Sequence, residues 1–565
     1  MRDFQPIQAT AYDLVVIGGG INGVGTARDG ALRGLKTLLI EKDDFASGTS
    51  SWSTRLIHGG LRYLEYFEFS LVRESLRERE VLLKTAPHLV HPLQLTIPVY
   101  DWSSRAYWEI KAGMILYDIF SFDKTLPPHR MLRPREFQQL FRVAEKKGLQ
   151  GGAQYFDGQV EYAERLALEV ALSAQQAGAT ILNYVAVTRL EKEGNPGAIT
   201  AIHCQDQLSD QTFTVDTRNA VVINTAGPWV DKVCALARQD HQPTSIVNGR
   251  KIGGTKGSHI VVDPFPGAPT VALYVEAFVD KRPYFIIPWL GKYLIGTTDH
   301  RYDGDLDSVK ASNDEIDYLI AETNRVMPGA QLSRDDVRFT YSGVRPLPYS
   351  DGKKAGSITR NHILYDHAQD GVHNLISLIG GKLTTYRQVG QEMVDKVYQK
   401  RHQSAPPCLT LTQPLPGAED CPLSLETAIA KYGDRVERQS IQHLYCVYSS
   451  RAIDVLALVD SAPDLGEKIV PNLPDIKAQV VFAVQAEMAH TLIDICRRRT
   501  AIAMVTNDYG FSTLTVVVET LTKHCGWTPE DGDRQIQQYH AYMEANCIPD
   551  YCLTDQPNKL ITNQT

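Results

Sequence analysis

The first clear pattern in the sequence is an apolar run, a helical stretch and a second apolar run. Leu14 to Ile17 form the first run, a sequence with the pattern of a helix extends to Arg33, and Thr37 to Ile40 form the second run. Short and almost wholly apolar runs on either side of a helix are typical of buried parallel strands. The pattern therefore predicts a βαβ unit over residues 12–44.

A glycine motif lies between the first strand and the helix. Gly18, Gly20 and Gly23 have GxGxxG spacing, and Glu41 ends the second strand. In such units the glycines permit a tight turn, a close approach of pyrophosphate and close packing of the helix, while the acid accepts hydrogen bonds from ribose hydroxyls. The unit predicts a dinucleotide site and leaves NAD and FAD open. Its place near the start of a long chain and the serine/threonine-rich segment 48–54 favour FAD.

Beyond this unit the sequence first lacks a regular pattern and then becomes rich in predicted β-strands. Leu71 to Lys84 read as a helix with a charged outer face, and later apolar runs rich in β-branched residues read as strands. The run that ends in NTAGP at 224–228 resembles a flavoprotein strand that returns to the nucleotide, and an ordinary strand that ends in a turn is the alternative. The predicted strand regions are residues 181–190, 198–204, 212–215, 220–227, 259–262, 284–289 and 293–299.

The last third of the chain contains a second strand and helix unit and then a boundary. Residues 373–397 read as strand, glycine pair and amphipathic helix, so they offer a second helix N-terminus to an electronegative part of a cofactor. The proline-rich segment 404–422 has no periodicity and predicts a domain boundary. The sequence after it predicts mainly helices, one of which is expected at residues 481–504.

Composition narrows the class of protein. The chain has 565 residues, 43% of them hydrophobic, which is enough for two or three domains, and its net charge of −8 argues against a nucleic-acid partner. The nine cysteines form no CxxC pair, so we expect no zinc site, no disulfide framework and a reducing cytoplasm. No apolar run approaches the ~18 residues of a membrane span, and the N-terminus does not resemble a signal peptide. Attachment to a membrane surface stays open.

Two adjacent glycines separate a histidine from an arginine in the stretch LIHGGLRYLE at residues 56–65. Inside a helix, Gly59 and Gly60 would each cost about 1 kcal/mol relative to alanine. We therefore expect this stretch to begin as a loop and to become helical only afterwards, with His58 and Arg62 held for contact with a ligand.

Seven short blocks in order resemble one family. They are GGGINGVG, TSSWSTRLIHGGLRYLE, KGSHIVV, IGTTDH, YSGVRPL, GGKLTTYR and AHTLIDICRRRT, and they span about residues 12–505. Together they resemble the FAD-dependent glycerol-3-phosphate dehydrogenases. The resemblance implies an α/β chain, α+β overall, with a glutathione-reductase-type FAD-binding Rossmann domain, an interleaved mixed β-sheet substrate domain and a helical C-terminal domain. Within residues 1–403 the expected FAD segments are 12–85, 155–255 and 355–403, the substrate segments are 86–154 and 256–354, and the helical domain is 404–565.

The resemblance also implies a reaction. sn-Glycerol 3-phosphate would lose a hydride from C2 to flavin N5 and a proton from its hydroxyl, giving dihydroxyacetone phosphate, and a quinone would take the electrons. We expect FAD as cofactor, no metal, a homodimer, and a cytoplasmic enzyme in peripheral contact with the inner face of the cytoplasmic membrane. Three alternatives stay open: an oxidase that releases hydrogen peroxide, a catalytically silent flavin-binding protein, and a flavin oxidase acting on an amine or amino acid.

The substrate phosphate is best bound by arginine, whose planar fork donates two hydrogen bonds. Arg345 is the first choice, and Lys382 beside its glycine pair is expected to reach both substrate and flavin. His58 is expected to act on the proton, because imidazole titrates near working pH; whether it removes the proton or orients the hydroxyl stays open. The expected catalytic set is His58, Arg62 and Lys382, and the expected substrate-binding set is Arg62, Tyr63, His259, Arg345, Arg360, Lys382 and Thr384.

The expected cofactor contacts gather in the glycine turns and the segments beside them. We interpret Gly59 and Gly60 as a close approach of the backbone to the flavin ring, where side chains would collide. The full set is Gly18, Gly20, Asn22, Gly23, Glu41, Lys42, Gly48, Thr49, Ser50, Ser51, His58, Gly59, Gly60, Val185, Ala226, Gly227, Trp229, Gly380, Gly381, Lys382, Leu383 and Thr384.

The chain departs from the family pattern in two places. Many members have WVDDAR where this chain has GQVEYAERL at 158–166, and the match is poor beyond about residue 510. Three consecutive arginines, 497–499, are interpreted as part of a salt-bridged helix in the C-terminal domain rather than as a cationic face for lipid headgroups.

Overall fold

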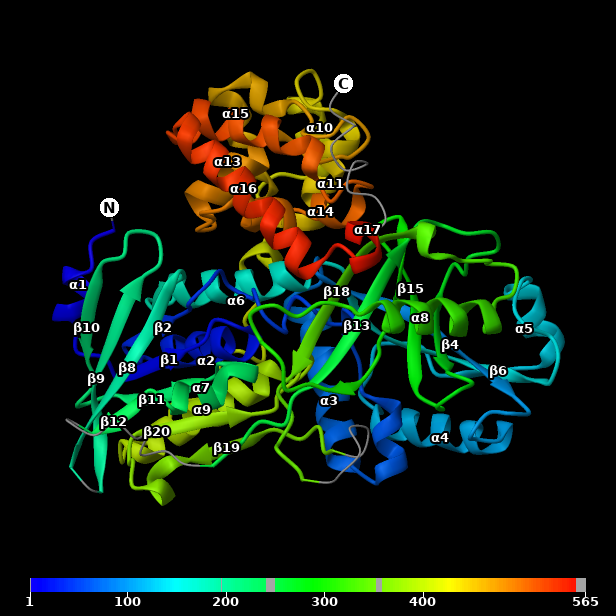
Figure 1. Cartoon of the computed structure of the whole chain (residues 1–565), viewed down its shortest axis with the longest axis horizontal. Coiled ribbons are helices and arrows are strands. Elements are labelled where there is room, and N and C mark those ends of the chain that lie inside the picture. The colour runs from blue at the N-terminus through cyan, green and yellow to red at the C-terminus, as the bar shows by residue number, and fades with distance from the viewer. Residues whose placement is uncertain (1, 195, 240–248, 352–357, 555–565) are drawn as a thin grey trace.

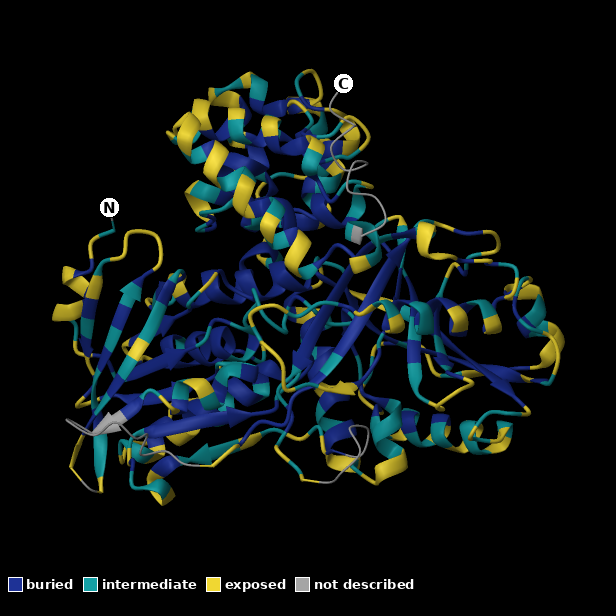
Figure 2. Ribbon diagram, viewed as in Figure 1, coloured by how far each residue is buried: buried dark blue, intermediate teal, exposed yellow. Residues whose placement is uncertain are grey.

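Three β-sheets and a helical C-terminal region make up the protein (Figure 1). The structure is a computed structural model that describes residues 2–194, 196–239, 249–351 and 358–554. The expected boundary near 354–355 lies outside the described residues. In Figure 1 the helical region stands above the two sheet-containing parts, and in Figure 2 the sheets and the helices beside them form the buried interior.

The first sheet has six strands and contains the predicted βαβ unit. Its order is β19 (Ile363–Asp366), β20 (Leu375–Ile379), β11 (Val221–Asn224), β1 (Leu14–Ile17), β2 (Thr37–Ile40) and β7 (Thr180–Leu182). All neighbours are parallel except β19 and β20. Helix α2 (Ile21–Leu32) joins β1 to β2, so the unit expected over 12–44 is confirmed.

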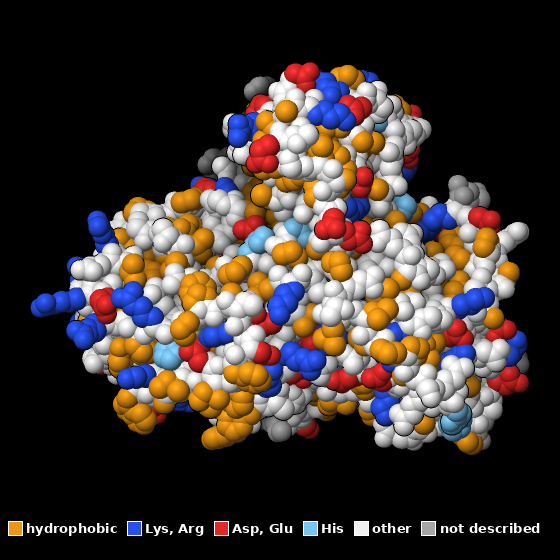
Figure 3. All heavy atoms as spheres, turned by 180° about the vertical axis from the view of Figure 1, so that it is seen from behind, with side chains coloured by type: hydrophobic (Ala, Val, Ile, Leu, Met, Phe, Trp, Pro, Cys, Tyr) orange, Lys and Arg blue, Asp and Glu red, His pale blue; other side chains and the backbone are white. Residues whose placement is uncertain are grey.

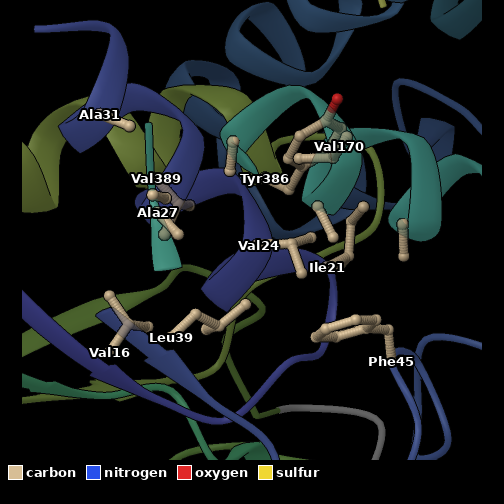
Figure 4. Packing of buried hydrophobic residues seen from close by; sticks show 14 of the residues in the cluster. Val16, Ile21, Val24, Ala27, Ala31, Leu39, Phe45, Val170, Tyr386 and Val389 are labelled. Carbon is tan, nitrogen blue, oxygen red and sulfur yellow. The ribbon is translucent and has the colours of Figure 1, made fainter. Parts of the chain in front are cut away.

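Helix α2 packs against one face of this sheet between α6 (Ala163–Gln176) and α9 (Tyr386–Lys400). Figure 4 shows Val16 and Leu39 of the sheet facing Val24 and Ala27 of the helix, and these four side chains are fully buried. Full burial of an aliphatic side chain contributes roughly 1.5–3 kcal/mol. The apolar face of α2 therefore fixes the glycine turn at its N-terminus relative to the sheet.

A smaller sheet covers the other face of the first sheet. It has the order β10 (Thr212–Asp216), β9 (Gly197–Asp206), β8 (Val185–Gly194) and β12 (Ala237–Gln239). Val15 and Leu38 of the first sheet share one buried cluster with Ile199 and Ile202 of β9. The nucleotide-binding edge is therefore held between helices on one side and a β-layer on the other.

The large sheet has ten strands drawn from three stretches of chain. Its order is β17 (His300–Arg301), β13 (Thr255–Val262), β16 (Lys292–Gly296), β15 (Pro283–Trp289), β14 (Ala272–Glu276), β4 (Val90–Tyr100), β6 (Leu149–Val160) and β3 (Leu56–Ile57), while β18 (Val337–Arg345) pairs with β13 and β5 (Arg130–Leu132) with β6. Strand β3 and the end of β6 belong to this sheet, although their residues fall in segments expected for the FAD domain. Four helices accompany the sheet, namely α3 (Phe69–Thr85), α4 (Tyr107–Phe120), α5 (Pro134–Leu140) and α8 (Asn313–Val326).

The element predictions hold except in two places. Each predicted strand region contains a strand, and the helices expected at 71–84 and after the second glycine pair are α3 and α9. The stretch 56–65 begins with the short strand β3 rather than a loop, and then forms a 3-10 helix, η1 (Leu61–Tyr66). The helical stretch expected at 481–504 is broken into α13 (Lys477–Ala486), a π-helical segment η9 (Asp494–Arg499) and α14 (Ile502–Val505).

The break in that stretch coincides with a buried ionic junction between the C-terminal region and the rest of the chain. Arg497 pairs with Glu164 of α6, while Arg498 and Arg499 pair with Asp44, which follows β2. These three arginines are almost fully buried, so their interpretation as salt-bridged is confirmed.

The remaining C-terminal helices pack on one another above this junction. They are α10 (Leu425–Tyr432), α11 (Arg438–Tyr448), α12 (Ala452–Ser461), α15 (Leu514–Cys525), α16 (Pro529–Asn546) and α17 (Asp550–Thr554). The proline-rich segment before them contains only the 3-10 turn η6 (Pro416–Ala418). Among the described residues, none of the helices has the length and apolar character that a bilayer crossing requires.

Candidate active site

One long cavity of about 380 Å³ lies between the six-stranded sheet and the large sheet. Most of the predicted ligand-binding residues line it, although they come from widely separated parts of the sequence. These are Gly18, Gly20, Asn22, Glu41, Lys42, Gly48, Thr49, Ser50, His58, Tyr63, Val185, Ala226, Gly227, Trp229, His259, Arg345, Arg360, Gly380, Gly381, Lys382, Leu383 and Thr384. Sequence reasoning missed several further lining residues, among them Trp52, Thr54, Ala186, Thr225, Gly257, Gly343 and Pro346.

The glycine turn has no room for side chains at two of its three glycines. Gly18 has φ +106°, and a Cβ there would lie 2.8 Å from the carbonyl oxygen of Thr225. A Cβ on Gly23 would lie 1.8 Å from the carbonyl oxygen of Gly18. Gly23 does not line the cavity, so its function is to let α2 approach β1, as the motif predicts.

The N-terminus of α2 opens into the cavity beside the serine-rich segment. Ser50 Oγ accepts a hydrogen bond from the Ile21 amide at 2.9 Å. Ser51 lies behind this segment, where its hydroxyl donates to the Ala46 carbonyl oxygen at 2.5 Å. The unpaired amides at the start of a helix attract anionic groups such as a pyrophosphate. Ser50 therefore lies where such a group is expected, whereas Ser51 supports the turn.

Glu41 lies at the end of β2 and is almost fully buried. Its carboxylate accepts hydrogen bonds from the Gly19 amide at 2.5 Å and the Asp43 amide at 2.9 Å. Burial, with the nearby charge of Asp43, raises the pKa of Glu41 to about 7. The carboxylate is thus fixed at the edge of the cavity, where ribose hydroxyls could donate to it.

Lys42 and Trp229 close the same end of the cavity. The Lys42 ammonium lies 4.6 Å from the Trp229 ring centroid, and Asp307 accepts hydrogen bonds from both side chains. Asp307 belongs to the loop after β17, so this contact joins the large sheet to the nucleotide-binding edge. A second cavity, which Tyr184 and Arg498 also line, adjoins this end and shares Lys42 and Trp229 with it.

Three buried polar atoms of cavity-lining residues have no hydrogen-bond partner among the described residues. They are Oδ1 of Asn22, near the glycine turn, Nδ1 of His259 and Nη1 of Arg360. Buried polar atoms are normally paired, so these positions indicate polar groups of a ligand. The tight glycine turn, the helix N-terminus beside it and these three atoms together fit FAD.

The other end of the cavity carries positive charge. Arg345 lies at the end of β18, where its guanidinium donates to Asp299 at 3.1 Å and to Thr297 Oγ1 at 3.1 Å. Arg360 donates to the other oxygen of Asp299 at 3.5 Å, and its Nη1 is buried without a partner. Arg282 lies 3.9 Å from that same oxygen. These four side chains carry three positive charges and one negative charge.

Asp299 is ionised within this group, since the charges of the arginines affect its pKa more than burial does. Burial alone would raise the pKa of Asp299, but Arg345, Arg360 and Arg282 hold it below its ordinary value. Conversely, burial and the neighbouring charge of Arg360 lower the pKa of Arg345, although Asp299 opposes them. The group is therefore cationic overall and would gain from an added anion.

Lys382 lies beside Tyr63, next to the second glycine pair. Its ammonium is 4.1 Å from the Tyr63 ring centroid and 3.4 Å from Ser75 Oγ. Burial lowers the pKa of Lys382 to about 7, although Glu74 and Glu68 oppose it. At neutral pH this lysine is therefore close to its midpoint of protonation.

Two histidines face the same part of the cavity, and both are held neutral. The His58 backbone amide donates to Thr384 Oγ1 at 3.2 Å, and burial together with the charge of Lys382 lowers the pKa of its imidazole. His259 stacks on Tyr341, and its Nε2 lies 2.9 Å from Thr54 Oγ1. Burial, with the charge of Arg345, lowers the pKa of His259 well below its ordinary value. Neutral imidazoles can accept a proton.

Gly59 and Gly60 differ from the sequence-based interpretation, since neither lines the cavity. A Cβ on Gly59 would lie 2.5 Å from both Leu76 and the Tyr117 hydroxyl, and a Cβ on Gly60 would lie 2.0 Å from the Tyr63 ring. Gly60 also has φ +71°, which favours glycine. Packing against α3 and against Tyr63 therefore explains both glycines without a flavin ring.

Arg62 also lies outside the main cavity. It lines an adjoining cavity together with Tyr66 and Glu68, and this cavity shares Tyr63 and Arg360 with the main one. Its guanidinium donates to the Tyr66 hydroxyl at 3.2 Å. The predicted roles of Arg62 in catalysis and substrate binding remain predictions, and direct contact would require the substrate to reach past Tyr63.

Comparison with known proteins decides the family. A model described as FAD dependent oxidoreductase matches residues 13–387, and one described as the C-terminal domain of alpha-glycerophosphate oxidase matches residues 408–532. A glycerol-3-phosphate dehydrogenase from Synechocystis sp. is 82% identical over 98% of this chain and 100% of its own length. The chain belongs to the FAD-dependent glycerol-3-phosphate dehydrogenase family.

Two further relatives extend this family assignment. The structure of a glycerol-3-phosphate dehydrogenase from Bacillus halodurans, complexed with FAD, superposes with a TM-score of 0.75 at 28% identity and covers 96% of each chain. A D-erythritol 1-phosphate dehydrogenase from Brucella abortus is 38% identical over 86% of this chain and 94% of its own length. The fold class, the FAD cofactor and the oxidoreductase class expected from the sequence are thereby confirmed.

Proposed function

We propose that this enzyme oxidises sn-glycerol 3-phosphate to dihydroxyacetone phosphate and passes the electrons to a quinone. The observation that carries the proposal is the cationic group at the far end of the FAD cavity, formed by Arg345, Arg360 and Lys382. A phosphate monoester carries nearly two negative charges near neutral pH, and arginine forks match its oxygens. The names of the Synechocystis and Bacillus halodurans relatives support the same substrate.

The side chains at this end of the cavity can meet the demands of alcohol oxidation. FAD, when bound, would supply a hydride acceptor for C2 of the substrate. Arg345 and Arg360 would bind the phosphate and so fix the position of C2, which is the positioning effect that turns a bimolecular step into an intramolecular one. His58, neutral and close to Thr384, would accept or orient the hydroxyl proton, with His259 as the alternative. Lys382 would stabilise negative charge next to the second glycine pair.

The reaction is tested by mixing the FAD-loaded protein anaerobically with glycerol 3-phosphate and following the visible absorbance of the flavin. We expect that absorbance to bleach with glycerol 3-phosphate and to persist with glycerol or with amino acids. Persistence with glycerol 3-phosphate would refute the enzyme proposal and leave the silent flavin-binding alternative. D-Erythritol 1-phosphate belongs in the same assay, since the Brucella abortus relative is named for it and the adjoining cavity at Tyr63 lies close to the site.

Contact with a membrane surface is supported by one helix whose outward face is apolar. Trp108, Ile115, Ile119 and Phe122 follow one another at helical spacing along α4 and just beyond it, and Trp108, Ile119 and Phe122 are 70%, 60% and 77% exposed. In Figure 3 hydrophobic side chains gather along the lower edge of the molecule, on the side where α4 lies. The outward face of a helix in a water-exposed position is normally polar, and large exposed apolar patches mark interaction sites.

The charges around this face suit an anionic lipid surface. Arg77 and Lys111 are exposed, and neither has an ion pair in the part of the chain that the structure describes. The nearby Asp118 is paired with Lys124, and Arg73 is paired with Asp123. Exposed cations without an ion pair therefore lie near an apolar face that contains an aromatic residue suited to the headgroup region. A quinone dissolved in the same bilayer would then be close to the enzyme.

Sedimentation with vesicles of anionic phospholipid tests the membrane contact. We expect Trp108→Ser combined with Ile119→Ser to reduce bound protein several-fold, while Leu208→Ser combined with Leu409→Ser, which removes exposed apolar side chains elsewhere, leaves it unchanged. Equal binding by both variants would place the contact on another surface. In cells, binding confined to the cytoplasmic face of the membrane would agree with the expected localisation.

The electron acceptor and the oligomeric state need separate measurements. Turnover with a quinone analogue should greatly exceed turnover with oxygen, and rapid stoichiometric release of hydrogen peroxide would instead establish the oxidase alternative. The expected homodimer is checked by light scattering of the FAD-loaded protein, and a monomer mass would contradict it.

A further inference from the structure

Asp299 joins the three arginines at the far end of the cavity but does not itself line it. Its Oδ1 accepts from Arg345 Nη1 at 3.1 Å, and its Oδ2 accepts from Arg360 Nη2 at 3.5 Å. Arg282 Nη2 lies 3.9 Å from the same Oδ2 and also stays outside the lining of the cavity. One buried carboxylate therefore contacts two cavity-lining guanidinium groups from behind.

The two cavity-lining arginines depend on Asp299 to different degrees. Arg345 Nη2 also donates to Thr297 Oγ1 at 3.1 Å and to the Thr298 carbonyl oxygen at 3.3 Å, so three acceptors fix its orientation. For the Arg360 guanidinium, Asp299 is the one hydrogen-bond acceptor found among the described residues. Loss of Asp299 would therefore release Arg360 and leave Arg345 largely in place.

Arg360 also has a free donor where a ligand is expected. Its Nη1 is buried and has no partner, while its side chain is only 16% exposed and lines both the main cavity and the adjoining one. Because the guanidinium is planar and rigid, a contact at one nitrogen restricts the directions in which its remaining N–H groups point. The free donor therefore gains its direction from the contact on the opposite side of the same group.

We propose that Asp299 is a positioning residue that orients Arg360 for the substrate phosphate. The proposal rests on the proposed function and deepens it, because it assigns to Arg360 the phosphate contact and to Asp299 the control of that contact. Arg282 also pairs with Asp280 at 3.6 Å, so Arg345, Arg360 and Asp299 leave one net positive charge that faces the cavity and attracts a phosphate. Orientation of a rotamer-rich side chain before binding removes part of the entropic cost of binding.

A simple counter-ion would behave in the opposite way. If Asp299 only reduced the positive charge, its neutralisation would remove the negative charge that opposes Arg345 and Arg360 and would tighten the binding of any anion. If it positions Arg360, its neutralisation weakens binding although the positive charge rises. The sign of the change therefore distinguishes the two roles.

The test measures the dissociation constant of inorganic phosphate for the FAD-loaded protein by calorimetry, together with kcat and KM for glycerol 3-phosphate. We expect Asp299→Asn to raise both the phosphate dissociation constant and KM about tenfold with kcat within about twofold of wild type. Arg360→Gln should raise the same two constants by at least as much. Arg282→Gln is the charge-matched control, since it removes a cation from the same carboxylate oxygen without altering the cavity lining, and it should change both constants less than about threefold.

A double substitution shows whether Asp299 acts through Arg360. In the Arg360→Gln background, Asp299→Asn should have no further effect on phosphate binding, because the group that it positions is gone. Independent, additive effects would overturn the proposal, as would tighter phosphate binding by Asp299→Asn or an effect of Arg282→Gln equal to that of Arg360→Gln. Expected changes in phosphate binding without turnover of glycerol 3-phosphate would refute the proposed function and keep this inference.

Discussion

Replacement of Lys382 by methionine should stabilise the fold while it reduces turnover. Lys382 lies in the cavity against Tyr63, and burial lowers the pKa of Lys382 to about 7. In the unfolded chain a lysine titrates near ~10.4. Between these two values the folded protein binds fewer protons than the unfolded chain, so the stability of the wild type rises with pH across this window.

The size of the effect follows from the two pKa values. A folded pKa of about 7 and an unfolded pKa near ~10.4 correspond to a destabilisation of about 4 kcal/mol at neutral pH. This term disappears as the pH rises through ~10.4, where both states are neutral. Methionine has a similar length and no charge, so Lys382→Met should be about 4 kcal/mol more stable than wild type near neutral pH, and the gap should close as the pH approaches ~10.4.

The assay is equilibrium unfolding by denaturant of the FAD-loaded protein, without substrate, at neutral pH and near ~10.4. Turnover of glycerol 3-phosphate, measured in parallel, should fall at least about tenfold, because the variant has no cation beside the second glycine pair. A difference in the free energy of unfolding that is the same at both pH values would refute the reasoning. So would a variant that is less stable than wild type at neutral pH.

Three further predictions concern the cofactor turn, the ionic junction and the phosphate contact. Gly23→Ala should abolish retention of FAD in absorbance spectra, because its Cβ would lie 1.8 Å from a carbonyl oxygen. Glu164→Gln should lower the free energy of unfolding by about 3–5 kcal/mol near neutral pH. The charges of Arg55 and Arg497 overcome burial and lower the pKa of Glu164 to about 2, so this loss should shrink as the pH falls from ~4.5 to ~2, where the wild-type carboxylate protonates. Arg345→Ala should raise KM for glycerol 3-phosphate at least about tenfold with little loss of bound FAD.

The predictions for Gly23 and Arg345 each have a matched control. Gly113→Ala, in α4, meets no atom within 4 Å and should retain FAD fully. Arg338→Gln removes a cation from the same strand as Arg345 but one that is paired with Asp263, so it should leave KM unchanged. A pH-independent effect at Glu164, or normal FAD content in the Gly23 variant, would contradict the corresponding explanation.

Local pattern was sufficient wherever the decisive contacts lie close together in the sequence. The βαβ unit, the strand regions and the helix after the second glycine pair are confirmed, because alternation, helical period and glycine spacing are properties of neighbouring residues. Local pattern failed at residues 481–504. The helix expected there is divided into three segments, and Arg498 and Arg499 of the middle segment pair with Asp44. The ion pair between Asp44 and Arg499 joins residues that are 455 positions apart. The periodicity of residues 481–504 therefore cannot predict the contact with Asp44.

The sequence by itself determined the dinucleotide unit, the order of elements and most of the residues that line the cavity. Only the tertiary structure showed that Asp299 and Arg282 join Arg345 and Arg360, that Gly59 and Gly60 pack against α3 and Tyr63, and that Arg62 faces a neighbouring cavity. The physical reason is the distance along the chain over which each kind of interaction acts. Backbone preferences act over a few residues, whereas the orientation of a guanidinium and the pKa of a buried lysine depend on charges and surfaces that only folding brings together.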